Sequence, residues 1–363
     1  MNATKLLTCA AALAIAAPVV ATAQVDPNAM RAHFISVGQG DATVLEFSCG
    51  LVMVDAGGQT DATDSTLVRY LRGIFAARPE LGDTIKTLFV THNHVDHNRA
   101  LDAVVAQFHV KYVVENGQRG PNPTRDPGDR AMLWLAQNAA AHGTRVLDVD
   151  DYDVQQTVVG LTSDTIDAVS CAGTDPEIRV LAADRATQPA DWPDGDFNDK
   201  NNHSVVVRVD FGTASFLFTG DMETKALETL VQQNANTNLL DVDVWHVGHH
   251  GSYNGTSPAI LAAIRRPKIA IISMSRCDDH SAHTAWKYGH PRQDAVSELR
   301  SAITRRRSTA RRVQVASAVE QFSGTMMRDA LYATGWDGTI VVRATATGTY
   351  RVTTEGGAVI ESC

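Results

Sequence analysis

Short apolar runs separated by turns open the main part of the chain. Residues 33–37, 42–47 and 51–54 are rich in apolar and β-branched side chains, and the segments between them contain glycine. Runs of this length, bounded by turn residues, are typical of strands that follow one another in a meander. The pattern therefore predicts a β-meander at the start of the folded domain.

Helical and extended patterns then alternate. Leu67, Leu71 and Phe75 recur at helical spacing, whereas residues 87–90 form a short apolar run with the length of a buried strand. The same alternation returns in the C-terminal half. The further predicted elements are strands at 110–114, 204–209, 215–218, 242–247 and 269–273, helices at 101–108, 131–141, 224–231, 258–264 and from Pro291, and a last hairpin over 338–353.

These alternating elements indicate the fold class. Strands that alternate with helices but also form hairpins in both halves favour a mixed α/β (α+β) protein, an αββα sandwich of two mixed β-sheets with helices outside. We expect a single domain over residues 30–360. Residues around 115–200 are less regular and rich in turn residues, so we expect them to form a loop-rich insertion.

Residues 1–23 have the pattern of a signal peptide. Lys5 supplies a positive start, residues 6–20 form an apolar centre, and Ala21-Thr22-Ala23 has the form of a cleavage site. The alternative is a buried N-terminal helix. No later stretch reaches the ~20 apolar residues that a membrane span needs. We therefore expect a periplasmic or secreted protein without a membrane span after cleavage.

The cysteines and the net charge narrow the remaining possibilities. Export implies an oxidising compartment, where Cys49, Cys171, Cys277 and Cys363 allow three pairings, so we interpret them as one or two disulfides or free thiols.

The net charge of −9 argues against a long nucleic-acid partner. The arginines of residues 300–312 fit a solvated helix face and turn, or alternatively a phosphate-binding patch. We expect a small-molecule substrate, and the sequence leaves the oligomeric state open.

The strongest chemical signal is the stretch THNHVDH, residues 91–97. It follows an apolar strand, and residues i and i+2 of an extended segment share a face, so His92 and His94 can bind one metal ion. Asp96 and His97 come where the chain turns into the next helix and can point to a second ion. Imidazole nitrogen and carboxylate oxygen suit zinc, and also manganese or iron.

Other strand ends supply further possible ligands. Asp221 ends an apolar strand, and its carboxylate can bridge two cations. His249 and His250 follow the strand over residues 242–247, and His203 stands just before the strand over residues 204–209. Together with the histidine loop, these positions predict a site for two divalent metal ions, with zinc as the first choice.

The motifs also resemble a known family. ISVGQGDATVLEF, VMVDAGG, THNHVDH, FLFTGD, VGHHGS, YGHP and DGTIVV occur in this order over most of residues 32–345. They are similar to the metallo-β-lactamase-fold superfamily of hydrolases, and in particular to the extracytoplasmic hydrolase domain of ComEC-type competence proteins. The motif set is specific for the fold, less so for this subgroup, and weak for the substrate.

The resemblance implies a role for each residue. His92 and His94 would hold the first metal with His203 as the third ligand, and Asp221 would bridge the two metals. The second metal would be held by Asp96, His97 and either His249 or His250. Asp55 would fix the histidine loop by hydrogen bonds. Two departures are Ser36, where the subgroup usually has Asp, and His203, where it usually has another residue, so His203 is either a ligand or a loop residue.

The expected activity follows from this site. Two neighbouring cations lower the pKa of a bridging water, so we expect hydrolysis by metal-bound hydroxide, which Asp96 would orient. His250 or His290 would protonate the leaving group or orient a neighbour. The resemblance favours a phosphodiester substrate. The alternatives are a lactone, thioester or β-lactam hydrolase of the same fold, or a metal-binding protein without catalytic activity.

Overall fold

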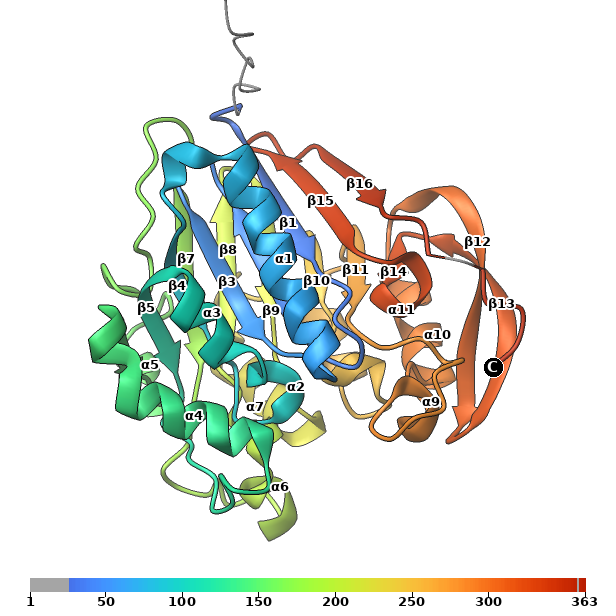
Figure 1. Ribbon diagram of the computed structural model, residues 1–363. Coiled ribbons are helices and arrows are strands. Elements are labelled where there is room, and N and C mark those ends of the chain that lie inside the picture. Colours follow the sequence, from blue (N-terminus) through green and yellow to red (C-terminus); the bar gives the residue numbers. More distant parts are fainter. Residues whose placement is uncertain (1–25, 358) are drawn as a thin grey trace, which may run out of the picture.

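Two β-sheets face each other in the computed structural model, which describes residues 26–357 and 359–363 (Figure 1). The predicted signal peptide lies outside the described residues. Within them, the first sheet has eight strands. In spatial order these are β16 (Tyr350–Thr354), β15 (Ile340–Thr345), β1 (Ala29–Phe34), β2 (Ala42–Glu46), β3 (Leu51–Ala56), β4 (Thr84–Phe89), β5 (His109–Glu115) and β6 (Arg145–Asp148).

The second sheet has six strands in the described part of the chain. Their spatial order is β14 (Leu331–Ala333), β11 (Ile269–Ile272), β10 (Val244–His246), β9 (Ala214–Phe218), β8 (Val206–Phe211) and β7 (Pro176–Ala182). Both sheets are mixed, since β1–β2 and β7–β8 are antiparallel whereas β3–β4 and β9–β10 are parallel. A separate hairpin is formed by β12 (Arg306–Ala318) and β13 (Gln321–Asp329).

The core lies between the two sheets, where aromatic side chains of opposite strands meet. The ring centroids of Phe34 and Phe218 are 6.2 Å apart, and those of Phe47 and Phe211 are 6.1 Å apart. All four side chains are buried. Burial of apolar surface is the main stabilising contribution to such a sandwich, so this layer fixes how the strand ends of the two sheets face each other.

Helices cover the outer faces of the sheets. On the first sheet, α1 (Asp61–Ala77), α3 (Leu101–Gln107) and α4 (Pro127–Asn138) lie in front in Figure 1. Leu67, Leu71 and Phe75 are the buried face of α1, as their spacing predicted. The larger buried residues of α7 (Thr224–Gln233), α8 (Pro258–Ile264) and α10 (Gln293–Ala302) belong to the same apolar cluster as the second sheet. The predicted αββα sandwich is confirmed.

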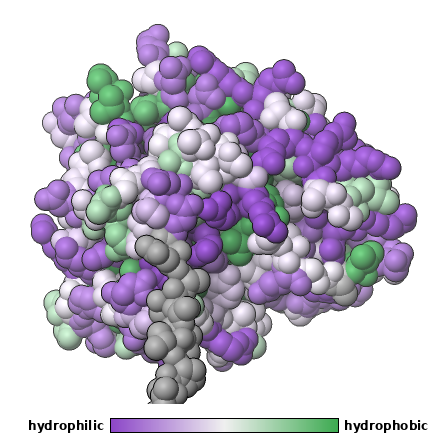
Figure 2. Space-filling model, turned by 90° about the horizontal axis from the view of Figure 1, so that it is seen from above, coloured by the Kyte–Doolittle hydropathy of each residue, from purple (hydrophilic) through white to green (hydrophobic). Residues whose placement is uncertain are grey.

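Shorter helices complete the fold. They are α2 (Val95–Asn98), α5 (Asp151–Gln155), α6 (Asp194–Asn198), α9 (Ala285–Tyr288) and α11 (Thr334–Asp337), with 3₁₀ turns at Pro79–Leu81, Ala139–His142, Lys200–His203 and His249–Gly251. None of the helices in the described residues combines the length and apolar character that a bilayer crossing demands. Seen from above, polar side chains predominate on the surface (Figure 2).

The structure differs from the sequence-based expectation in two regions. Residues 115–200 contain long loops, but they also supply β6 and β7, the outermost strands at one side of each sheet. The arginines of residues 305–312 lie at the start of the β12–β13 hairpin and not on a helix face. In that part of β12 most residues on both faces are exposed, so no alternating pattern marks it as a strand.

The four cysteines of the folded part form two disulfides, Cys49–Cys171 and Cys277–Cys363. The first joins the turn after β2 to the segment before β7, and therefore links the first sheet to the start of the second. The second joins the chain end to the segment after β11. The interpretation of these cysteines as disulfides is confirmed, and they contribute no metal ligand.

Candidate metal centre

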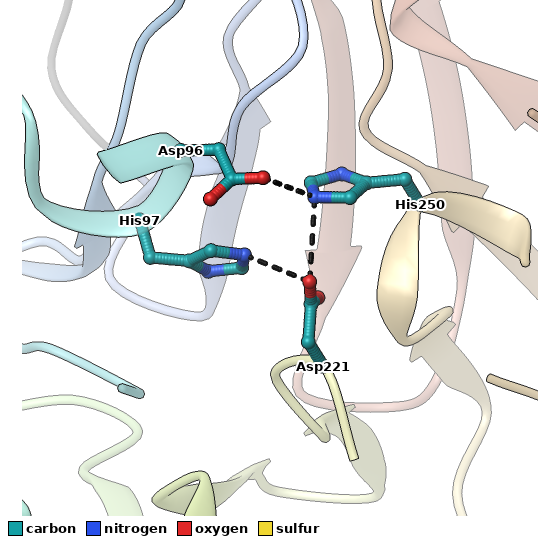
Figure 3. A group of neighbouring side chains, drawn as sticks. All are labelled: Asp96, His97, Asp221 and His250. Carbon is teal, nitrogen blue, oxygen red and sulfur yellow. Dashed lines mark hydrogen bonds and ion pairs between the residues drawn. The ribbon is translucent and has the colours of Figure 1, made fainter. Parts of the chain in front are cut away.

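Loops that follow three strands meet at one edge of the sandwich. The segment after β4 carries residues 91–97, Asp221 follows β9, and His250 follows β10. Figure 3 shows that Asp96, His97, Asp221 and His250 point toward one another from these separate elements. Acids and histidines that are far apart in the sequence therefore meet where strands end, which is where functional sites commonly lie.

The distances within this group are short. His97 Nε2 lies 3.2 Å from Asp221 Oδ2, and His250 Nε2 lies 3.4 Å from the same oxygen. His250 Nε2 is also 3.2 Å from Asp96 Oδ2. One ligand atom from each of the four residues falls within 4.8 Å of all the others, which is the compactness that a metal ion requires.

Asp55 determines which nitrogen of His97 faces the group. Its carboxylate accepts hydrogen bonds from the backbone N–H of Thr91 at 2.7 Å and from the Thr91 hydroxyl at 2.9 Å. It also lies 2.8 Å from Nδ1 of His97. Because a carboxylate accepts, Nδ1 carries the proton, and the lone pair of the neutral ring is on Nε2. That lone pair is directed toward Asp221.

This arrangement fits a cation. His97 Nε2 is buried and makes no hydrogen bond, although it lies 3.2 Å from the carboxylate of Asp221. Two electron-rich atoms at that distance repel each other unless a proton or a metal ion lies between them. Burial lowers the pKa of His97, but the carboxylates of Asp221 and Asp55 outweigh burial and raise it well above its usual range. The cluster thus attracts positive charge strongly.

His250 experiences the same field. Burial lowers its pKa, but the charges of Asp221 and Asp41 and the hydrogen bond with Asp96 outweigh burial and raise the pKa to about 10. A divalent cation would satisfy these carboxylates better than single protons, because it neutralises more than one of them. Asp96, His97, Asp221 and His250 therefore fit a divalent metal.

His92 and His94 lie beside this group. His92 Nε2 is 3.1 Å from His94 Nδ1, and the His92 ring centroid is 4.2 Å from that of His97. Burial and the neighbouring His97 and His94 lower the pKa of His92 well below its usual range, so its ring is neutral and offers a lone pair. In the described part of the chain, no third acid, histidine or cysteine joins these two rings in an equally compact group.

His203 is the predicted ligand that the structure places elsewhere. Its Nδ1 lies 2.9 Å from Asp184 Oδ1, and its Nε2 lies 2.6 Å from the carbonyl oxygen of Phe197. Both ring nitrogens are thus engaged outside the cluster. The 3₁₀ turn Lys200–His203 directs the ring away, while the next residue, Ser204, reaches the site and lies 3.4 Å from His92 Nδ1. Of the two alternatives for His203, these contacts favour a loop residue.

The backbone directs the side chains of His249 and His250 to different places. Both residues have positive φ angles, of 49° and 52°, so the chain turns sharply between their side chains. His250 points into the cluster, whereas His249 Nδ1 lies 3.0 Å from Asn254 Oδ1 and 3.5 Å from Glu223 Oε1. His249 therefore lies at the rim of the site.

A cavity of about 800 Å³ opens onto the cluster. His94, Asp96, His249 and His290 line it, and the His290 ring stacks on that of His250 with centroids 6.3 Å apart. Arg99, Arg125 and Lys200 line it as well. Asp126 and Asp129 also belong to the lining, so the cavity walls carry charges of both signs.

Two residues of the site were missed by the sequence-based prediction. Asp41 Oδ2 lies 3.8 Å from His97 Nδ1, and Asp41 Oδ1 lies 3.6 Å from Nε2 of His246. The backbone N–H of Asp41 donates to the carbonyl oxygen of Asp96 at 2.8 Å. A side chain at Gly40 would come within 2.9 Å of that same carbonyl. The glycine turn followed by an acid was the available signal for Asp41; His246, inside β10, gave none.

Comparisons with known proteins identify the family of this chain. The family model described as "Metallo-beta-lactamase superfamily" matches residues 35–275. The chain is 25% identical over 284 residues to ComE operon protein 3 of Bacillus subtilis, covering 73% of this chain and 30% of that protein. It is 40% identical over 90 residues to Recombination protein 2 of Haemophilus influenzae, covering 25% of this chain and 10% of that protein.

The chain therefore spans less than a third of the length of these curated relatives. Among solved structures, the metallo-beta-lactamase fold protein YhfI from Bacillus subtilis matches 76% of this chain and 94% of that chain. The sequence identity is 9% and the TM-score is 0.37.

Proposed function

We propose, from the premise that this chain belongs to the metallo-β-lactamase superfamily, that it is an exported metal-dependent hydrolase that acts on a small phosphodiester. The match of the family model over residues 35–275 establishes the membership. The observation that carries the proposal is the compact buried group of Asp96, His97, Asp221 and His250, which opens into a cavity whose lining includes Arg99, Arg125 and Lys200.

In this proposal the protein side chains hold two divalent ions. His92 and His94 would bind the first, Asp96, His97 and His250 would bind the second, and Asp221 would supply a further carboxylate ligand. Zinc suits these ligands best, and manganese or iron are the alternatives. When bound, two such ions supply an ionised water near neutral pH and offset the negative charge that develops on the attacked centre.

The surrounding residues position these groups. Asp55 keeps the His97 ring in one orientation, and such supporting hydrogen bonds tune both metal affinity and geometry. The side chain of Asp96 is 25% exposed, the most accessible of the four, so it is placed to orient an attacking water from the cavity.

His290 fits an orienting role better than that of a proton donor. Burial and the neighbouring His250 and His249 lower the pKa of His290 well below its usual range, so its ring is neutral. Its Nδ1 lies 3.5 Å from the side-chain amide of Gln39, which also lines the cavity. Because the Gln39 amide donates to Nδ1, the proton of the neutral ring is on Nε2, which can donate a hydrogen bond to the substrate or to a water.

The cations of the cavity wall favour a phosphate group. Lys200 is held by Asp129 at 3.1 Å, and Arg99 pairs with Asp64 at 3.1 Å, whereas Arg125 makes no ion pair within the described residues. Arginine recognises phosphate oxygens through paired donors. The net charge of −9 disfavours a long nucleic acid and leaves a small phosphodiester as the proposed substrate.

A panel of three bond types tests this function. Zinc-loaded and manganese-loaded protein should hydrolyse bis(p-nitrophenyl) phosphate, and chelation should abolish the reaction, with His94→Ala as the inactive control. If nitrocefin or a lactone is hydrolysed and the phosphodiester is not, the phosphodiester assignment is wrong. If metal binds and none of the substrates is hydrolysed, the protein is a metal-binding protein without this catalysis.

The proposed location is periplasmic or secreted. Residues 1–23 have the pattern of a signal peptide, and the two disulfides suit an oxidising compartment. N-terminal sequencing of the protein recovered from outside the cytoplasm should begin after Ala23. Recovery of the intact N-terminus from the cytoplasm would contradict export.

A further inference from the structure

A second cavity lies away from the metal centre, between helix α1 and the first sheet. Its volume is about 850 Å³, and none of its lining residues lines the cavity at the metal centre. Arg31 and His33 on β1, Val341 on β15, and Arg69 and Tyr70 on α1 form its walls. The volume falls within the range of small-molecule sites in proteins.

The floor of this cavity is a buried polar network around Glu46. His33 Nε2 lies 3.1 Å from Glu46 Oε2, and Arg78 Nη1 donates to Glu46 Oε1 at 2.6 Å. The side chains of His33, Glu46 and Arg78 are 8%, 5% and 6% exposed. Buried charges persist only when they are paired and hydrogen-bonded, so the network is a built feature of the fold and not a surface contact.

The network also fixes the aromatic wall. His33 joins Glu46 to the aromatic wall, since its Nε2 lies beside Glu46 Oε2 and its Nδ1 lies 2.9 Å from the Tyr70 hydroxyl. Burial and the charges of Glu355 and Glu46 raise the pKa of Tyr70 to about 12, so the hydroxyl keeps its proton. The Tyr70 ring is therefore held in place beside the cavity.

The arginines that line the cavity differ in how many of their hydrogen-bond donors already have a partner. Arg78 is saturated by Glu46, Glu80 and two backbone carbonyls. Arg31, in contrast, contacts Glu46 through Nη1 alone and is 44% exposed, which leaves Nε and Nη2 for another partner. In the described part of the chain, Arg69 donates only to the Thr66 hydroxyl.

Charge and apolar surface are both available to a ligand. The lining holds three arginines against the carboxylates of Glu46 and Glu355, so positive charge is in excess. Ile74, Ala77 and Val341 add apolar surface next to the arginines. Guanidinium groups with free donors match the oxygens of a carboxylate, sulfonate or phosphate.

We propose that this cavity binds a small organic anion. Its acidic head contacts Arg31 and Arg69, and its apolar body packs against Tyr70, Ile74 and Val341. The ligand is a compound with one acidic group on a ring or short hydrocarbon, and its binding needs neither metal ion nor the proposed hydrolysis.

Isothermal titration calorimetry of the folded, metal-chelated protein with naphthalene-2-sulfonate tests this site. The native protein should bind one equivalent, and Arg69→Gln and Arg31→Gln should each weaken binding at least fivefold. Arg72→Gln is the matched control, since Arg72 lies on the same helix but donates to Gln107 outside this cavity. It should bind like the native protein.

Neutral naphthalene-2-sulfonamide separates charge recognition from apolar contact and should bind at least fivefold more weakly than the sulfonate. Arg69 is exposed, so Arg69→Gln tests the site without disturbing the buried network. The proposal is overturned if the native protein does not bind the sulfonate, if Arg69→Gln and Arg72→Gln bind it equally, or if the amide binds as well as the anion.

Discussion

Asp55 lies 2.8 Å from Nδ1 of His97 and holds this contact from a backbone conformation with φ of 60°. The same carboxylate accepts from the backbone N–H of Thr91, at the start of the histidine loop. Asp55, near the end of strand β3, thus sets both the position of the histidine loop and the direction of the His97 lone pair. Metal binding should depend on this residue, although Asp55 is not among the proposed ligands.

Asp55→Asn should therefore weaken zinc binding by ~10-fold to 100-fold, the usual effect of losing such a supporting carboxylate. Asparagine tolerates positive φ, so the backbone is retained. Competition against a chromophoric chelator measures the affinity. Asp83→Asn is the control, since Asp83 has a φ of 51° but is exposed and outside the site. Equal affinities for Asp55→Asn and the native protein would contradict the role of Asp55.

The adjacent histidines give a second test. His250→Ala should lose one of the two expected ions, because His250 is in the cluster, while His249→Ala should keep both, because His249 is bound to Asn254 and Glu223. Elemental analysis of the dialysed variants measures the metal content. The reverse result would show that the chain turns the other way in solution.

His203→Ala should leave the metal content unchanged. Its ring is engaged by Asp184 and the Phe197 carbonyl, so its removal should instead lower the free energy of unfolding by about 1–3 kcal/mol. Urea unfolding of the metal-free protein measures this loss, and metal analysis is made on the same samples. A missing ion with unchanged stability would restore His203 as a ligand.

Glu46 gives a pH-dependent test of stability. Burial raises its pKa, but the hydrogen bond and charge of His33, the charge of Arg31 and the hydrogen bond from Arg78 outweigh burial and lower the pKa to about 2. The folded value is below the ordinary 4.5, so the stabilisation is present above pH 4.5 and is lost as the pH falls toward about 2. In Glu46→Gln this part of the pH dependence should disappear.

At pH 7, Glu46→Gln should lower the free energy of unfolding by about 3 kcal/mol, which is what a shift of this size amounts to. Urea unfolding between pH 7 and pH 3 provides the curve. Glu80→Gln is a fitting control, because Glu80 binds the same guanidinium of Arg78 but is exposed, and it should change stability by less than about 1 kcal/mol. Parallel curves for Glu46→Gln and the native protein would rule out the pKa shift.

The sequence predicted the fold well where apolar periodicity and end signals agreed. The helix expected over residues 258–264 has the observed bounds, because Ser257 caps it and Pro258 occupies its first turn. The β12–β13 hairpin was not predicted. Its first residues are charged and exposed on both faces, so no burial pattern distinguishes strand from helix there.

The sequence predicted those members of the cluster that follow a buried strand. Asp96, His97, Asp221 and His250 meet because each follows a buried strand. The side-chain direction of His203 depends on a 3₁₀ turn and on partners in the β7–α6 region, and the choice of His250 depends on positive φ angles that histidine does not signal. These side-chain directions depend on tertiary contacts, which the pattern of apolar residues along the sequence does not encode.

The C-terminal hairpin has a consequence for how the molecule is assembled. β1 pairs with β2, its neighbour in the chain, but its other edge is covered by β15, which is synthesised long after β1. Until residue 340 has emerged, one edge of the first sheet has open backbone donors and acceptors that can pair with another chain. Proteolytic loss of β15 and β16 should therefore produce self-associating fragments, even though the ligand set of the metal centre would still be intact.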